Sequence, residues 1–358
     1  MSIARIEKVQ QILKKNGFAT TIVTDLSSIS YLVDLAPSHM GERLMALAIP
    51  QEGKCKLFIN ALYPTEPQEE FDVVYHNDSD IATAGLAEYL PAGKTGIDKF
   101  MMAKFLLELM GQRSDLEYRL GSFAVDEARM IKDEDEKEAM RFASKVNDQV
   151  ISMVPGMLRE GMTEKELSKL MNAEYLRLGD PSSPSEPLIC FGAGSAEPHH
   201  TTGDKKLEPG DVVLIDCGQT TFGYNSDMTR TFFYKSITEE QKKVYEIVRE
   251  ANKRAREAIK PGARFCDIDA AARDYITEMG YGEYFTHRTG HCIGRDVHEE
   301  PSVSSVNTDV VRPGTCFSIE PGIYLNGKFG VRIEDLVIAT EDGYELLNFA
   351  PKEIMIIE

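Results

Sequence analysis

The sequence lacks a long apolar run, and about 20 apolar residues in a row are needed to cross a membrane. It also lacks the pattern of a secretion signal in its first residues. Its first residues, MSIARIEKVQQILKKNGF, follow the spacing of an amphipathic helix, not that of a charged segment followed by an apolar one. We therefore expect a soluble protein of the cytoplasm that has no membrane partner.

The chain is also poor in basic residues and in paired cysteines. It has 58 acidic and 40 basic residues and a formal net charge of −18, which argues against binding to nucleic acid, because phosphates require a basic surface. The six cysteines are scattered, without a CxxC pair or a dense framework. This spacing is typical of free thiols in a reducing compartment.

The chain does have two different patterns along its 358 residues, a length that predicts two domains. Residues 1–125 alternate strand-like and helix-like segments, which predicts a small α/β domain. In residues 126–358, two helical segments followed by a β-rich stretch occur twice, which predicts an α+β domain with helices backing antiparallel strands. Capping boxes indicate where two of these helices begin: Thr163 with Glu166, and Thr238 with Gln241.

The stretch VVLIDCGQTTFGYNSDMTRTFFY, residues 212–234, places two carboxylates in apolar, β-like runs. Asp216 ends the first run, and Asp227 lies eleven residues further on, in the next. An isolated carboxylate in such a place costs several kcal/mol or becomes neutral. We therefore expect a positive charge beside both aspartates.

Further residues suited to metal binding or acid–base chemistry lie near apolar runs of the same half. They are His199 and His200 in PHH, His291 and His298 in GHCIGRDVHE, Glu320 in SIEPGIY, and Arg332 and Glu334 in GVRIED. Converging carboxylates repel one another unless cations lie between them, and oxygen-rich sites with one imidazole suit Mn²⁺, Co²⁺ or Zn²⁺. Two such ions, about 3.5–4 Å apart, lower the pKa of a bridging water and so supply hydroxide for hydrolysis.

Simpler interpretations of these residues remain open on spacing alone. A single aspartate in a strand is usually a cap or an ion-pair partner, and His200 could merely accompany His199. The period of two places Arg332 and Glu334 on one face of a strand, where they could form an ordinary surface ion pair.

Four blocks, DCGQTTFGYNSDMTRT, GHCIGRDVHE, SIEPGIY and GVRIED, resemble in this order the signature blocks of the pita-bread metallopeptidases. That family contains methionine aminopeptidases, Xaa-Pro aminopeptidases, prolidases and creatinase. The resemblance implies a pita-bread C-terminal domain over residues 126–358, with an antiparallel sheet and a pseudo-twofold repeat. It also implies that residues 1–125 form a smaller, creatinase-like α/β domain.

The resemblance further implies a role for each matching residue. It implies five ligands for two divalent ions, with Mn²⁺ preferred and Co²⁺ or Zn²⁺ as alternatives: Asp216, Asp227, His291, Glu320 and Glu334. Glu320 would also carry protons to and from a metal-bridging hydroxide. His199 would contact the substrate and its leaving amine, His298 would hydrogen-bond the substrate carbonyl, and Arg332 matches an arginine near the site in proline-specific members.

The resemblance also narrows the choice among the enzymes of this family. Methionine aminopeptidases typically lack a domain like residues 1–125, and both creatinase and the non-catalytic relatives lack the metal ligands. We therefore expect an Xaa-Pro dipeptidase, or prolidase, acting on a small peptide with proline at the second position. The alternative is an Xaa-Pro aminopeptidase acting on longer peptides, and a creatinase-like hydrolase or a binding protein is less favoured.

A dipeptidase must also recognise a free carboxylate close to the scissile bond. Arg332 and Arg295 are the candidates, although Arg295 could instead pair with a neighbouring acidic residue. The loop DLAPSHMGERL, with His39 and Arg43, resembles one that reaches a neighbouring subunit's active site in short bacterial prolidases. The resemblance therefore implies a homodimer in which these two residues contribute to substrate binding.

Overall fold

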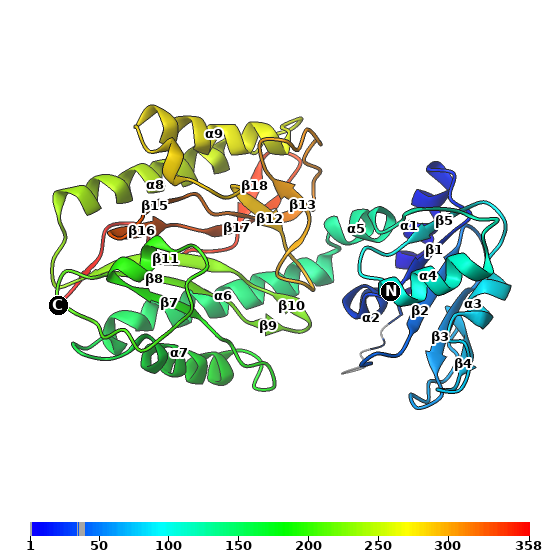
Figure 1. Cartoon of the computed structure of the whole chain (residues 1–358). Helices are drawn as coiled ribbons and strands as arrows, with labels where there is room; N and C mark the ends of the chain where they lie inside the picture. The colour runs from blue at the N-terminus through cyan, green and yellow to red at the C-terminus, as the bar shows by residue number, and fades with distance from the viewer. Residues whose placement is uncertain (1, 34, 36–39) are drawn as a thin grey trace. The chain divides into compact units, whose positions relative to one another are not determined.

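The computed structural model describes residues 2–33, 35 and 40–358, and it divides into two compact units, Met1–Arg129 and Met130–Glu358 (Figure 1). The expected boundary after residue 125 falls inside helix α5 (Phe123–Met130). The two units divide between Arg129 and Met130, four residues further on and within the last turn of the same helix.

The N-terminal unit is built around a six-stranded mixed sheet of order β4-β3-β2-β1-β5-β6. Its strands are β1 (Thr20–Val23), β2 (Met45–Pro50), β3 (Cys55–Asn60), β4 (Phe71–His76), β5 (Lys94–Ile97) and β6 (Glu117–Leu120). Its other helices are α1 (Ser2–Lys15), α2 (Leu26–Val33), α3 (Ala84–Tyr89) and α4 (Ala103–Gln112). Strand β1 is antiparallel to β2 and parallel to β5, so the predicted α/β class of this unit is confirmed.

The C-terminal unit repeats one order of elements, as the sequence predicts. The first set is α6 (Glu134–Met157), α7 (Glu164–Leu178), β7 (Leu188–Phe191), the 3₁₀ turn η1 (Gly192–Ala196), β8 (Val212–Cys217), β9 (Thr220–Thr221), β10 (Tyr224–Asn225) and β11 (Met228–Tyr234). The second set is α8 (Glu239–Glu257), α9 (Phe265–Glu278), the 3₁₀ turn η2 (Gly282–Tyr284), β12 (Gly290–Cys292), β13 (Glu299–Val303), β14 (Cys316–Ile319), β15 (Gly322–Leu325), β16 (Phe329–Arg332), β17 (Asp335–Ala339), β18 (Tyr344–Leu346) and β19 (Ile356–Ile357).

The strands of this unit form two main sheets, each backed by one helix pair. The sheets have the orders β19-β11-β8-β7 and β13-β12-β14-β17-β18, and apart from the β11–β19 pair their strands are antiparallel. One apolar core joins α6 and α7 to the first sheet, and another joins α8 and α9 to the second. Figure 1 shows α8 and α9 along one side of the strands and α6 and α7 along the other. This arrangement confirms the predicted pita-bread architecture.

The two predicted capping boxes are confirmed and determine where α7 and α8 begin. The Glu166 backbone N–H donates to Thr163 Oγ1 at 3.2 Å, and the Thr163 N–H donates to Glu166 Oε2 at 2.8 Å. Thr238 and Gln241 form the same reciprocal pair at the start of α8. Each box satisfies backbone donors that the first helical turn leaves without partners.

Two expectations from composition can be compared with the structure. All six cysteines are free, and five of them are buried. Among the described residues there is no helix with both the length and the apolar character needed to cross a membrane.

Candidate metal centre

A cavity of about 740 Å³ in the C-terminal unit gathers most of the chemically suited side chains. The predicted site residues that line it are His199, Asp216, Asp227, His291, His298, Glu320, Arg332 and Glu334. They come from both halves of the unit, so neither helix–helix–sheet set forms the site alone.

The two aspartates of the first half are brought together by antiparallel pairing. Strand β8 pairs with β11 so that Asp216 lies opposite Thr229, and Asp227 directly precedes β11. The short β9–β10 ribbon makes the connection between the two strands. The pairing therefore places both carboxylates at the same end of the hairpin, although eleven residues separate them in sequence.

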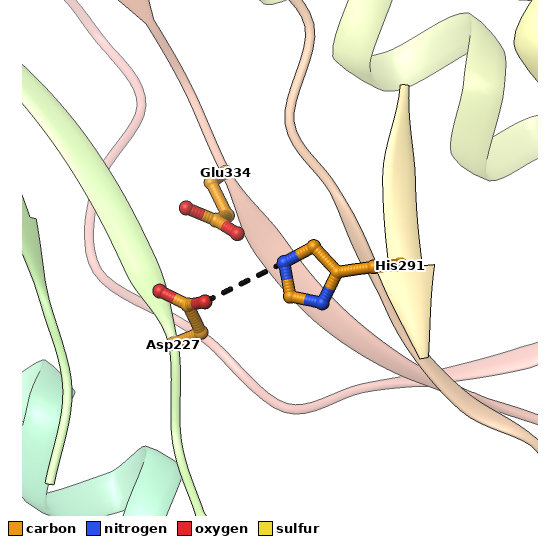
Figure 2. Close-up of side chains that lie close together, drawn as sticks. All are labelled: Asp227, His291 and Glu334. Carbon is orange, nitrogen blue, oxygen red and sulfur yellow. Dashed lines mark ion pairs between the residues drawn. The ribbon is translucent and has the colours of Figure 1, made fainter. Parts of the chain in front are cut away.

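Asp227, His291 and Glu334 form the centre of the site. One possible ligand atom from each lies within 4.8 Å of the others, and Figure 2 shows the three side chains converging. His291 Nε2 is 3.7 Å from Asp227 Oδ2 and 3.3 Å from Glu320 Oε1. Three of the four predicted carboxylate ligands therefore lie around the one imidazole.

The pKa values of this cluster indicate that its carboxylates outnumber the positive charges near them. Burial and the neighbouring carboxylates raise the pKa of Asp227 and of Glu334 well above their usual values. Burial also raises the pKa of Glu320 to about 7, and it lowers the pKa of His291 to about 3, so this imidazole is neutral. A neutral imidazole is the form that binds a metal, and bound cations would favour the ionised carboxylates.

Glu334 supplies a direct test of whether a metal fits. Its side chain is buried; Oε2 accepts a hydrogen bond from Thr229 Oγ1 at 2.7 Å, whereas Oε1 has no hydrogen-bond partner among the described residues. A buried oxygen without a partner is costly, and a cation at this position would satisfy it. The donor set, carboxylates with one imidazole, also suits borderline divalent ions.

The orientation of His291 is set by its own strand and the next one. Its Nδ1 lies 3.1 Å from the Cys292 carbonyl oxygen, and donation there leaves the lone pair of Nε2 facing the carboxylates. Its backbone N–H donates to Ser318 Oγ at 3.0 Å, and that hydroxyl donates to Glu320 Oε1 at 3.2 Å. The ring of His298 meets that of His291 edge to face, with centroids 4.3 Å apart.

Asp216, the fifth predicted ligand, is paired with an arginine. Arg332 Nη2 donates to Asp216 Oδ2 at 2.7 Å, and Arg332 Nε donates to Thr229 Oγ1 at 2.9 Å. Arg332 is buried, with 4% of its surface exposed, so it does not form the surface ion pair with Glu334 that spacing alone left open. The Arg332 guanidinium therefore contacts Asp216 directly, and it contacts Glu334 through the hydroxyl of Thr229.

Three further residues of the site were not singled out from the sequence. His287 and Arg288 line the cavity, and His287 Nε2 lies 2.8 Å from the hydroxyl of Tyr324, which also accepts from Arg332 Nη1 at 2.9 Å. Burial lowers the pKa of His287 to about 4. In the described part of the chain, the Arg288 side chain forms no hydrogen bond or ion pair. The sequence could have pointed to His287 and Arg288, because they lie only four and three positions before the predicted ligand His291, in HRTGH.

The remaining predicted residues lie elsewhere. The Arg295 guanidinium lies over the ring of Tyr224, 5.6 Å from its centroid, and is not among the residues that line the cavity. In the N-terminal unit, Arg43 donates to both carboxylate oxygens of Asp78, at 2.9 and 2.8 Å. His39 lies outside the described residues.

Comparison with known proteins gives consistent results over the whole chain. The profile of Metallopeptidase family M24 matches residues 138–341, and that of the Creatinase/Prolidase N-terminal domain matches residues 5–131. The Xaa-Pro dipeptidase of Pyrococcus horikoshii is 32% identical, and the match covers 98% of each chain. The crystal structure of a recombinant prolidase from Thermococcus sibiricus has a TM-score of 0.90 and 37% identity, with 98% of each chain covered. That of an X-Pro aminopeptidase from Thermotoga maritima has a TM-score of 0.78 and 29% identity, with 95% of this chain and 98% of that one covered.

Proposed function

The chain belongs to metallopeptidase family M24, and from this premise we propose that it is an Xaa-Pro dipeptidase, a prolidase. The observation that carries the proposal is a single cavity that joins a carboxylate–histidine cluster to an arginine without a side-chain partner among the described residues. The cluster suits hydrolysis, and the arginine suits the free carboxylate of a dipeptide.

We assign the metal ligands as the resemblance implies. Asp227, His291 and Glu334 would hold the ions, and Asp216 and Glu320 would complete the set. When bound, divalent cations activate water and polarise the peptide carbonyl as Lewis acids. The repulsion among the carboxylates supports this assignment, as does Glu334 Oε1, which has no hydrogen-bond partner in the described part of the chain.

Glu320 is the proposed proton carrier. It lines the cavity beside His291, and a positioned carboxylate can accept and release protons during the reaction. The leaving nitrogen belongs to proline, and in the peptide it carries no hydrogen. Glu320 would therefore take a proton from the attacking water and deliver it to that nitrogen.

Two histidines would act on the substrate itself. Burial and the charge of Arg288 lower the pKa of His298, so at neutral pH it is an uncharged hydrogen-bond donor. We propose that it donates to the carbonyl oxygen as negative charge develops there. His199 lines the same cavity, and we propose that it lies beside the leaving amine.

Arg288 is the proposed reader of the substrate carboxylate. The other cavity arginine, Arg332, already donates from each of its three nitrogens, to Asp216, Thr229 and Tyr324, so its orientation is set by the protein. We therefore propose Arg288 for this role in place of Arg295, which does not line the cavity. The alternative is an Xaa-Pro aminopeptidase, which the Thermotoga maritima relative supports, but the dipeptidase relative has the higher TM-score, 0.90 against 0.78.

The test is hydrolysis of an Xaa-Pro dipeptide, its C-terminal amide and an Xaa-Pro-Xaa tripeptide by one preparation, after chelation and after Mn²⁺ restoration. We expect cleavage of the dipeptide that depends on metal, and about 10- to 100-fold lower kcat/KM for the amide, because a charge-assisted hydrogen bond is lost. Preference for the tripeptide would instead establish an aminopeptidase. Failure to cleave any of the three under every metal condition would refute the peptidase proposal.

A pair of variants isolates the carboxylate contact. Arg288→Met should remove the preference for the dipeptide over its amide, while Arg295→Met, the matched control outside the cavity, should retain it. If Arg295→Met lost the preference and Arg288→Met kept it, the original expectation for Arg295 would be restored.

We also propose Mn²⁺ as the metal, a homodimer as the assembly and the cytoplasm as the location. The oxygen-rich ligand set supports the first, although Co²⁺ and Zn²⁺ suit it too, and the free thiols support the last. The homodimer rests on the resemblance, as does the contribution of His39 and Arg43 to a neighbouring subunit's site. Light scattering on the purified protein would measure the mass of the assembly.

A further inference from the structure

Glu164 is fully buried although it lies in the first turn of α7, where glutamate is usually solvated. Its Oε1 accepts the backbone N–H of Phe191 at 2.8 Å. Its Oε2 accepts the backbone N–H of Gly203 at 2.7 Å and lies 3.0 Å from His200 Nε2. The Glu164 carboxylate therefore contacts three nitrogen atoms: the backbone nitrogens of Phe191 and Gly203, and Nε2 of His200.

These contacts are not needed to cap the helix. Thr163 and Glu166 already form the reciprocal capping box at the start of α7. The carboxylate of Glu164 instead binds both ends of segment 192–203, because Phe191 directly precedes η1 and Gly203 closes the segment. His200 is its third donor and lies inside the segment.

The same segment carries His199, which lines the cavity. The His200 backbone N–H donates to the Glu197 carbonyl at 3.0 Å, so the turn around His199 is tied at the residue that follows it. The imidazole of His200 packs against Gly194, where an added Cβ would lie 3.0 Å from Cε1. The ring is thus held between the glycine and Glu164, next to the histidine that faces the cavity.

We propose that Glu164 and His200, together called the clasp, are positioning residues that hold His199 at the cavity wall. The inference rests on the role proposed above for His199. Charge-assisted hydrogen bonds to a buried carboxylate are stronger than neutral ones, so the clasp defines the path of the segment more tightly than backbone turns alone. His200 is therefore not a passenger beside His199.

Two substitutions at one position separate the hydrogen bond from packing. His200→Gln places an amide N–H near the position of Nε2, and we expect a kcat/KM for the dipeptide close to that of the native protein. His200→Leu keeps the bulk without the donor, and we expect kcat/KM to fall by about 10- to 100-fold, as small misplacements of catalytic groups do. Bound metal per chain, measured by mass spectrometry, should stay the same in both.

A double-mutant cycle distinguishes positioning from general damage. In a His199→Ala background, His200→Leu should cause no further loss, because the group that it positions is already absent. Independent losses that multiply would overturn the inference. If His199→Ala alone left kcat/KM unchanged, the role proposed for His199 would fail, and hydrogen exchange would then decide on the clasp by itself.

That second measurement does not depend on activity. Glu164→Gln should speed amide exchange in residues 191–203, since two of its acceptor contacts are to backbone N–H groups there. Exchange elsewhere in the C-terminal unit should be unchanged. Unaltered exchange in the segment, or faster exchange throughout the unit, would show that Glu164 and His200 do not act as a clasp.

Discussion

Glu334 and Asp335 are neighbours in sequence and both are buried, yet their carboxylates lie in opposite electrostatic surroundings. Glu334 lines the cavity with Asp227. Asp335 Oδ1 instead lies 2.8 Å from Arg230 Nη2 and 2.9 Å from Lys352 Nζ. Successive side chains of an extended segment point to opposite sides, so one backbone can serve two groups of residues. One is the cavity cluster of Asp227, Glu320 and Glu334, and the other is the ion-pair cluster of Arg230, Asp335 and Lys352.

The difference is visible in the two pKa values. Burial alone raises the pKa of each group, but the cations around Asp335, including Arg256 at 3.6 Å, bring its pKa below the usual value. Around Glu334, the charges of Glu320 and Asp216 add to burial and raise its pKa well above the usual value. The ion-pair cluster therefore has enough cations to offset burial. In the cavity cluster, Arg332 lowers the pKa of Glu334 but does not offset burial and the neighbouring carboxylates.

Arg230 connects the two clusters. Its Nη1 donates to the carbonyl oxygens of Glu334 at 2.6 Å and Thr229 at 2.9 Å, while Nη2 donates to Asp335. The ion-pair cluster thus holds the backbone from which the cavity cluster projects. The comparison teaches that burial of a charge does not by itself indicate function, whereas burial among carboxylates that outnumber their counter-charges indicates a ligand or metal site.

Asp227→Ala should break the cavity cluster with the largest effect on activity. We expect loss of metal binding and a fall in kcat/KM of about 1,000-fold or more, because the contribution of metal ions amounts to several kcal/mol. Circular dichroism should remain native, since the substitution relieves repulsion between buried carboxylates. Full activity in this variant would refute the metal-centre model.

Asp335→Ala should have the opposite profile, with its main effect on folding. Removing one partner of a buried ion pair leaves Arg230 without its counter-charge and should lower the free energy of unfolding by about 3–5 kcal/mol. Thermal denaturation in chelator measures this, with the exposed Glu341→Ala as a matched control. A smaller loss for Asp335→Ala than for metal-free Asp227→Ala would reverse the contrast between the clusters.

Metal affinity should also rise with pH. In the metal-free protein Asp227, Glu320 and Glu334 have raised pKa values, so protons stabilise the cluster at low pH and that contribution is lost as pH rises through those values. Metal must displace the protons, so the association constant should increase about tenfold per pH unit for each proton displaced, from the usual carboxylate range to above pH 7. Calorimetry of Mn²⁺ binding in buffers of different ionisation enthalpy counts the protons. An affinity independent of pH would mean that the carboxylates are already ionised without metal.

Much of the site could be predicted from residue types and their order, but not from spacing alone. The aspartates of residues 212–234 indicated a counter-charge because apolar runs surround them. The hydrogen-bond partners of these residues could not be predicted from the sequence. Arg332 donates to Asp216, which is 116 positions away, and to Thr229, which is 103 positions away. Arg288 was not singled out for the same reason, because only the folded chain shows that it lines the cavity and that Arg295 does not.

The sequence by itself determined the features that depend on neighbours along the chain. These are the two capping boxes, the repeated order of helices and strands, and the residue types available to the metal centre, because capping and periodicity act over a few residues. Only the tertiary structure decided which charges meet. It paired Asp335 with Arg230, left Glu334 among carboxylates and gave His200 a buried acceptor in Glu164. Electrostatic energy depends on distance and burial in space, which a linear order of residues does not contain.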